Sequence, residues 1–202
     1  MVSDFKQKRH GRAIAVTDIA IDKVRATRFH GFTNEQLNYI RDRHKELLRE
    51  VQQLNNLHQS NLMEVGILID LFTWQYWIIY GTNEREVLMR NNLDAYKVLE
   101  SAGKNRLLFM HNHPSTGTFS GEDFKYFCNH ESLYMMTAIG NDGTIYALTK
   151  TPQFDMRVLG EYSKKADWYK SIGKINNGTL AMKDILKIAN QYGLEYKKGG
   201  HK

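Results

Sequence analysis

The sequence of 202 residues contains one cysteine, two prolines and no long apolar run. Because a disulfide needs two thiols, the single Cys128 excludes an intramolecular disulfide framework and a zinc site built from several thiolates. The apolar runs are far shorter than the ~20 residues of a membrane-spanning helix, and the amino terminus lacks the apolar segment of a secretory signal. We therefore expect a cytoplasmic protein without membrane contact, in which histidines and carboxylates would hold any metal.

The composition is that of a globular protein, with 42% hydrophobic and 25% charged residues. The length fits one domain with extensions, and no low-complexity linker divides the chain. We expect an amino-terminal arm at 1–33, a central domain at 34–172 with its core at 60–150, and a helix with a basic tail at 173–202.

The net charge of +6 is unevenly distributed. Residues 1–60 carry 11 Lys and Arg against 7 Asp and Glu, residues 61–150 carry 7 against 10, and residues 151–202 carry 10 against 5. Basic ends are compatible with nucleic-acid binding, although scattered lysines are also typical of a solvated surface. We expect 5–12 to be a mobile arm and 195–202 to be a frayed tail.

The hydrophobic pattern predicts an α/β protein in which a mixed β-sheet is sandwiched by helices, with additional helices at both ends. The predicted helices are 34–56, 93–102, 120–129, 154–172 and 180–192, and the predicted strands are 61–72, 74–80, 106–110, 132–139 and 144–148. Weaker patterns predict two further strands, at 13–21 and 84–89.

The segment that carries chemistry begins where a buried strand ends. His111 and His113 are two residues apart, so they face the same side of a strand, and Pro114 then ends the strand. Asp123 lies in the first turn of the next helix and can supply a third ligand. Two imidazoles and one carboxylate leave the fourth position of a tetrahedral Zn²⁺ open for water, which is the catalytic pattern, with one zinc per chain. Ser120 and Asp123 also fit a helix N-cap, and both roles are compatible.

Hydrolysis at such a metal needs a proton acceptor and a donor to the oxyanion. Glu64 is the candidate base, because a carboxylate in an apolar strand is costly unless it is used or paired. The alternatives are Asp70, Glu84 and Glu86. Ser120 is the candidate donor, since it precedes the helix that carries the third ligand.

Together these residues resemble the motif of the JAB/MPN (JAMM) zinc metalloprotease family. The motif elements are Glu64, then His111-Asn-His-Pro114, then Ser120-Gly-Glu-Asp123. The central Asn and the Ser after the Pro are closer to the bacterial RadC-like branch. The resemblance covers about 60–150, and the loop of 115–119 has five residues where the family usually has six.

The resemblance implies a cytidine-deaminase-like fold and a role for each residue. His111, His113 and Asp123 would bind zinc, Glu64 would act as general base, and Ser120 would stabilise the oxyanion. The expected activity is cleavage of an amide bond in a protein or peptide substrate.

Two other functions remain open at this stage. One is a RadC-like protein that acts on nucleic acid, which it would contact through its basic ends and could cleave as a nuclease. The other is a non-catalytic MPN scaffold. The terminal helices could shape a substrate groove or form a homodimer interface, and the sequence does not choose between these roles.

Overall fold

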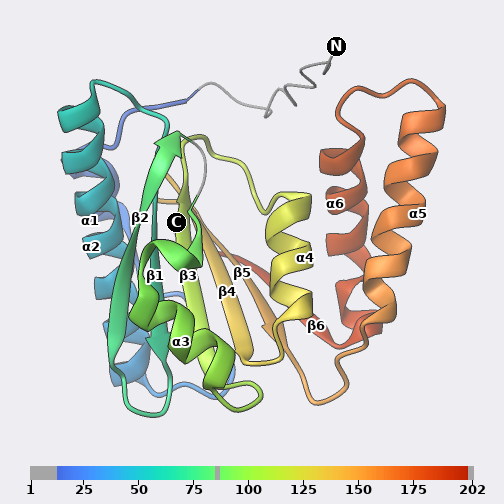
Figure 1. The fold of residues 1–202 in the computed structure, drawn as a ribbon, viewed down its shortest axis with the longest axis horizontal. Helices are drawn as coiled ribbons and strands as arrows, with labels where there is room; N and C mark the ends of the chain where they lie inside the picture. Colours follow the sequence, from blue (N-terminus) through green and yellow to red (C-terminus); the bar gives the residue numbers. More distant parts are fainter. Residues whose placement is uncertain (1–12, 85–86, 200–202) are drawn as a thin grey trace.

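The centre of the molecule is an open mixed sheet of six strands in the order β2-β1-β3-β4-β5-β6 (Figure 1). The computed structural model describes residues 13–84 and 87–199. Strands β3 and β4 run parallel, and the other neighbouring pairs are antiparallel. The strands are β1 (Met63–Asp70), β2 (Tyr76–Glu84), β3 (Leu107–His113), β4 (Leu133–Gly140), β5 (Ile145–Lys150) and β6 (Leu194–Gly199).

Helices cover both faces of this sheet (Figure 1). Helices α1 and α2 pack on one face, and α3 to α6 pack on the other. The helices are α1 (Asp18–Lys23), α2 (Asn34–His58), α3 (Leu93–Ser101), α4 (Gly121–Asn129), α5 (Arg157–Ser171) and α6 (Asn177–Ile188), with short 3₁₀ helices η1 (Met89–Asn91) and η2 (Ala189–Tyr192). The expected α/β architecture with a mixed sheet between helices is confirmed.

Alternation along the strands produces two cores. In β1, Val65 and Ile67 contact the core beneath α2, whereas Leu68 points to the core beneath α3 to α6. All side chains of β1 and β3 are buried. The central strands therefore read as nearly continuous apolar runs, as is typical of a sheet covered on both sides.

The long helix α2 begins where the sequence predicts it. The Thr33 hydroxyl accepts from the Gln36 amide, and the Gln36 side chain accepts from the Thr33 amide, which completes a capping box. The buried residues of α2 then follow at helical spacing along its whole length.

Three local expectations were wrong. Residues 13–21 form no strand: an extended segment leads into α1, which Thr17 caps through the amide of Ala20. The strand expected at 84–89 does not form in its described part: Glu84 is the last residue of β2, residues 87–88 belong to no helix or strand, and η1 begins at Met89, while 85–86 lie outside the described residues. Residues 5–12 lie outside the described part.

The carboxy-terminal end is the third correction. Residues 194–199 are not frayed but form the edge strand β6, which pairs with β5 from Ile145 to Lys150. The adjacent lysines Lys197 and Lys198 break the alternating pattern of a strand and so hide it in the sequence, and such charges are a usual way to keep a sheet edge from pairing with other chains. Within the described residues, no helix combines the length and apolar character needed to span a membrane.

Buried His44 makes the stability of this fold depend on pH. Its Nε2 lies 2.8 Å from the Thr137 hydroxyl of β4, and burial lowers its pKa from 6.5 to about 4. A depressed histidine pKa favours the neutral ring in the folded state, so the stabilisation is complete above 6.5 and is lost as the pH falls toward 4. We expect the wild type to lose about 2 kcal/mol more unfolding free energy than His44→Gln between pH 7 and 5.

Urea unfolding at several pH values measures this difference. His58→Gln is the matched control for the substitution itself, because His58 is exposed at the end of the same helix. Equal slopes in the wild type and His44→Gln would contradict the assignment.

Candidate metal centre

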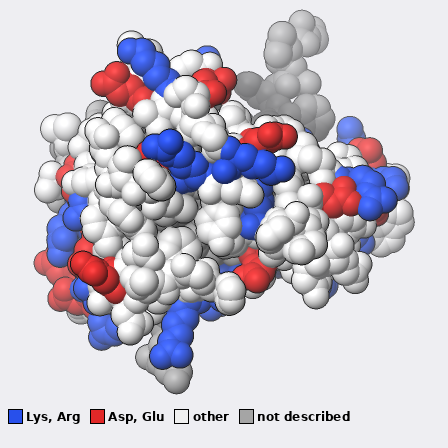
Figure 2. Space-filling model, turned by 90° about the horizontal axis from the view of Figure 1, so that it is seen from below, with Lys and Arg blue, Asp and Glu red and all other residues white. Residues whose placement is uncertain are grey.

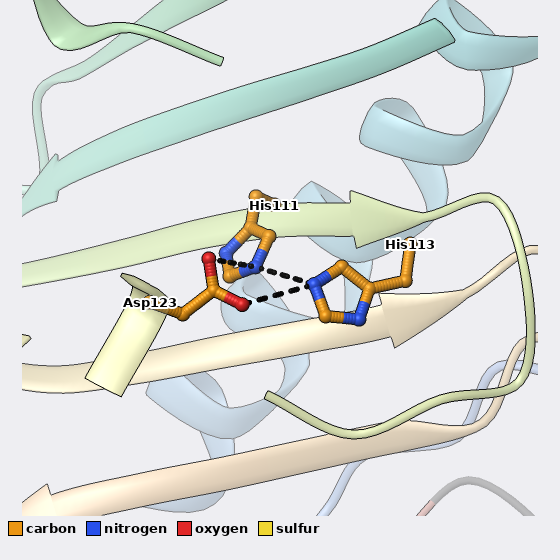
Figure 3. Close-up of side chains that lie close together, drawn as sticks. All are labelled: His111, His113 and Asp123. Carbon is orange, nitrogen blue, oxygen red and sulfur yellow. Dashed lines mark hydrogen bonds and ion pairs between the residues drawn. The ribbon is translucent and has the colours of Figure 1, made fainter. Parts of the chain in front are cut away.

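Two histidines at the end of β3 face the same side of the sheet. Figure 3 shows their imidazoles side by side, with the Nε2 atoms 3.0 Å apart. Both residues are buried, His111 at 3% and His113 at 7% exposure. The strand thus presents two ring nitrogens at one point, in the arrangement that the two-residue spacing predicts.

Asp123 reaches the same point from α4. Its Oδ2 lies 3.2 Å from His113 Nε2, and its Oδ1 lies 3.5 Å from His111 Nε2 (Figure 3). The carboxylate is held by a capping box: Asp123 Oδ2 accepts from the Ser120 amide at 2.7 Å, and Ser120 Oγ accepts from the Asp123 amide at 3.1 Å. The five-residue loop of 115–119 thus brings the aspartate to both histidines.

The ring orientations suit metal binding. His113 Nδ1 lies 3.2 Å from the carbonyl oxygen of Gly117, and donation to that carbonyl would leave Nε2 to face a metal ion held between the ring and Asp123. The ring of Phe109 stacks on His111, with centroids 5.5 Å apart and planes 19° from parallel. Backbone and packing therefore fix both imidazoles before any ligand binds.

The electrostatics favour an ionised carboxylate. Burial acts to raise the pKa of Asp123, but the charges and hydrogen bonds of His111 and His113 outweigh it and hold this pKa well below its usual range. The candidate ligand atoms of the three residues all lie within 4.8 Å of one another. Two imidazoles and a carboxylate are nitrogen and oxygen donors that zinc accepts, so these residues could hold a metal ion.

Asn112, between the histidines, faces the opposite side of the sheet and ties β1 to β3. Its Oδ1 accepts from the Val65 amide at 2.7 Å, and its Nδ2 donates to the Met63 carbonyl at 3.2 Å and to Asn141 Oδ1 at 3.1 Å. Asn141 in turn donates to the carbonyl of Ile14 at 2.8 Å. The structural roles of Asn112 and Asn141 were not predicted from the sequence. The available signal was the amide side chain of Asn112, which stands between two proposed ligands.

These bonds enclose Glu64 between two anchored residues of β1. Glu64 is 4% exposed, and it lies two residues along β1 from Gly66, whose partner on β3 is His111. Because β1 and β3 are antiparallel and Glu64 and Gly66 share a face, this step leads toward His113. Glu64 is therefore on the strand next to the histidines and on their side of the sheet, but it is not part of the three-residue group.

The rival base Asp70 lies elsewhere, at the other end of the sheet. Asp70 pairs with Leu107 at the other end of β3, and Arg106 binds its carboxylate through Nε at 2.9 Å and Nη2 at 2.5 Å. The Arg106 hydrogen bonds lower the pKa of Asp70 to about 2. Asp70 therefore does not face the site. Its even offset from Glu64 along the strand had left open that it would. Glu84 is the last residue of β2, and Glu86 lies outside the described residues.

Ser120 contributes through its backbone as well as its side chain. Since Ser120 Oγ accepts from the Asp123 amide, its own hydroxyl proton remains available to donate. The residue is partly exposed at the amino terminus of α4.

Comparison of the chain with family models, curated proteins and solved structures found no match.

Gly121 allows α5 to pack against the turn that carries Asp123. A Cβ on Gly121 would lie 1.8 Å from the Tyr162 hydroxyl oxygen and 2.7 Å from the ring carbon that bears it. Tyr162 is 5% exposed and its ring packs at a tilt against Phe124 of α4. The absence of a side chain at Gly121 thus sets how closely the two helices approach.

We expect Gly121→Ala to lower the unfolding free energy by about 1–3 kcal/mol, because the overlap with Tyr162 must be relieved by movement. In a Tyr162→Leu background, which lacks the hydroxyl and its ring carbon, the same glycine substitution should cost less, as measured by urea unfolding. Gly160→Ala on α5 is the control: nothing lies within 4 Å of its Cβ position, so alanine should stabilise that helix by about 0.5–1 kcal/mol. A harmless Gly121→Ala would show that the contact is not tight.

Proposed function

We propose that the chain is a metal-dependent hydrolase of the JAMM type, related to the RadC-like branch, which cleaves an amide bond in a protein or peptide. The proposal depends on one observation. The motif contains His111 and His113 at the end of β3 and Asp123 in α4, and the candidate ligand atoms of these three residues lie within 4.8 Å of one another. The helix–sheet–helix layering supports the cytidine-deaminase-like fold that the motif implies.

The donor set fits a divalent ion such as Zn²⁺. Two imidazole nitrogens 3.0 Å apart, both directed at an ionised carboxylate, are placed better for a shared cation than for hydrogen bonds alone. An ion held there would supply Lewis-acid polarisation of a carbonyl group and would make water acidic enough to lose a proton near neutral pH.

Glu64 is proposed to receive that proton and pass it to the leaving amine. It is buried on the face of β1 that adjoins the histidines. The bonds from Asn112 to Val65 and Met63 hold the backbone on either side of Glu64. The base therefore rests on a rigid strand rather than on a loop, which favours precise positioning.

Ser120 is proposed to donate its hydroxyl hydrogen to the oxyanion that develops on the attacked carbonyl. Its oxygen is fixed by the Asp123 amide, so the direction of the remaining O–H is restricted. A donor held before the reaction begins costs little reorganisation, and one such donor typically contributes about 10²–10³ in rate.

Metal content tests the ligand set directly. We expect about one zinc per chain in the wild type after zinc addition and dialysis, and loss of the metal in His113→Ala and in Asp123→Ala, measured by elemental analysis. His130→Ala is the control, because His130 caps the far end of α4 and its Nδ1 contacts the Tyr126 carbonyl at 2.8 Å. Circular dichroism would check that each variant is folded.

Other outcomes of the metal measurement would contradict the proposal. Zinc retention in both ligand variants, or equal loss in His130→Ala, would refute the three-residue site. A folded wild type that takes up no zinc would refute the hydrolase and leave the scaffold as the better explanation.

Activity should separate the base from the ligands. On zinc-loaded protein, we expect Glu64→Gln to keep the metal while the hydrolysis rate of a peptide or isopeptide substrate falls by about 10²–10⁴, the usual contribution of a general base. Ser120→Ala should cost about 10²–10³ in rate and about 1 kcal/mol in stability, because it loses both donor and cap. Ser120→Thr, which keeps both, should recover most of each loss.

A panel of fluorogenic peptides and an isopeptide-linked substrate provides the measurement. If zinc-loaded wild type cleaves none of them, or if Glu64→Gln cleaves them at the wild-type rate, the proposed mechanism fails.

A further inference from the structure

The two histidines of the candidate metal centre are oriented by different contacts. His113 Nδ1 lies 3.2 Å from the Gly117 carbonyl oxygen, so a hydrogen bond can fix its ring. His111 Nδ1 is buried and has no hydrogen-bond partner among the residues that the structure describes. A metal-binding histidine usually donates its second ring N–H to a carboxylate, a carbonyl or a water, which sets the ring orientation. Within the described part of the chain, packing takes over this task for His111.

Two phenylalanine rings lie against the His111 imidazole. The ring of Phe109 stacks on it, with centroids 5.5 Å apart and planes 19° from parallel. The ring of Phe119 is tilted by 54°, with its centroid 6.5 Å from that of His111. The stack is the closer contact, and turning the imidazole about its Cβ–Cγ bond would break it. The Phe109 ring therefore favours one orientation of the His111 ring.

The Phe109 ring is itself held between β1 and α4. Its centroid lies 6.2 Å from that of Tyr126 on α4, and Phe109 is 6% exposed. On β1, Gly66 pairs with His111 and is diagonally opposite Phe109. A Cβ on Gly66 would lie 2.8 Å from Phe109 Cε2 and 3.0 Å from Val87 Cγ1. A side chain at position 66 would overlap the ring, so the glycine provides the room that the ring occupies.

We propose that Phe109 is a positioning residue for the candidate metal centre. Its ring orients the His111 imidazole toward the ion, as the hydrogen bond to Gly117 does for His113, and Gly66 leaves the space for this stack. The role rests on the proposed function, because it concerns the same ligands. It adds two residues that lie outside the JAMM-like motif. Phe109 acts through His111 and contributes no ligand atom.

Crystal structures of the metal-free wild type and Phe109→Leu test the orientation without any ion. Leucine keeps a buried apolar side chain at this position but has no ring to stack on His111. We expect the His111 ring to leave its wild-type orientation, or to occupy two, whereas His113 stays with Gly117. An unchanged His111 ring would overturn the proposal, whether or not the protein binds metal.

Phe127→Leu is the matched control. Phe127 is fully buried in the same core as Phe109, and its ring makes no ring contact with either histidine among the described residues. The control should therefore lower the free energy of unfolding to a similar extent as Phe109→Leu, because both remove ring atoms from the core. It should leave both histidine rings in place.

Zinc affinity, measured by competition with a chelator, tests the consequence for the ion. We expect Phe109→Leu to bind zinc about tenfold more weakly, the lower end of the usual loss when an orienting partner is removed. Phe127→Leu should bind zinc as the wild type does. Equal weakening in the two variants would mean that lost packing, not the stack, is responsible, and would overturn the proposal. A wild type that binds no zinc refutes the proposed function, and the metal-free structures still decide the role of Phe109.

Cobalt in place of zinc separates orientation from general loosening, because the visible absorption of Co²⁺ depends on the number and geometry of its ligands. We expect the wild type and Phe127→Leu to give the same spectrum. Phe109→Leu should give a different and weaker one, since His111 no longer ligates the ion in every molecule. Identical spectra for all three cobalt-loaded proteins would contradict the proposed role.

Gly66→Ala tests the same stack in a protein that keeps the ring, and it serves if Phe109→Leu does not fold. The added methyl group must displace the Phe109 ring, so we expect zinc affinity to fall about as far as in Phe109→Leu. In the Phe109→Leu background, Gly66→Ala should cause little further loss, because the ring that it displaces is gone. Fully additive losses would show that Gly66 acts apart from Phe109 and would overturn this step.

Gly103→Ala is the control for the glycine substitution. Nothing lies within 4 Å of a Cβ on Gly103. It lies between α3 and β3, at the lower end of Figure 1, which is opposite the histidines and is the end that Figure 2 shows. Zinc affinity should stay at the wild-type value in this variant, and a loss equal to that of Gly66→Ala would overturn the role of the Gly66 contact.

Discussion

Burial of both faces of β3 is the constraint on which the candidate metal centre depends. Strands β1 and β4 flank β3, helices cover it above and below, and all seven of its side chains are buried. Three of them, in the run His-Asn-His, are polar and must find partners inside the protein. The histidines meet Asp123 on one face, whereas Asn112 bonds to the backbone of β1 and to Asn141 on the other. Because side chains alternate along β3, the candidate ligands lie on one face and Asn112, which anchors the strand, lies on the other.

The start of α4 meets a structural and a chemical need with the same atoms. Ser120 caps the helix, and Asp123 returns a hydrogen bond to the Ser120 amide while its carboxylate faces both histidines. From the sequence alone, Ser120 and Asp123 fit both a helix cap and a metal-binding motif. The structure explains this ambiguity, because the capping hydrogen bonds orient the Asp123 carboxylate toward the two histidines. An aspartate held only by its own rotamer would lose more side-chain entropy on binding an ion.

Local signals carried most of the sequence prediction. The capping box at Thr33, the helical spacing of α2 and the two-residue spacing of the histidines all act within a few residues, and the corresponding elements were predicted correctly. The errors arose where distant contacts decide. Edge strand β6 exists because β5 is there to pair with it, and its lysines gave no strand pattern. The bond from Asn141 to Ile14 joins residues 127 positions apart, and the cavity lined by Phe32, Trp74, Asn105 and Tyr134 joins four distant segments.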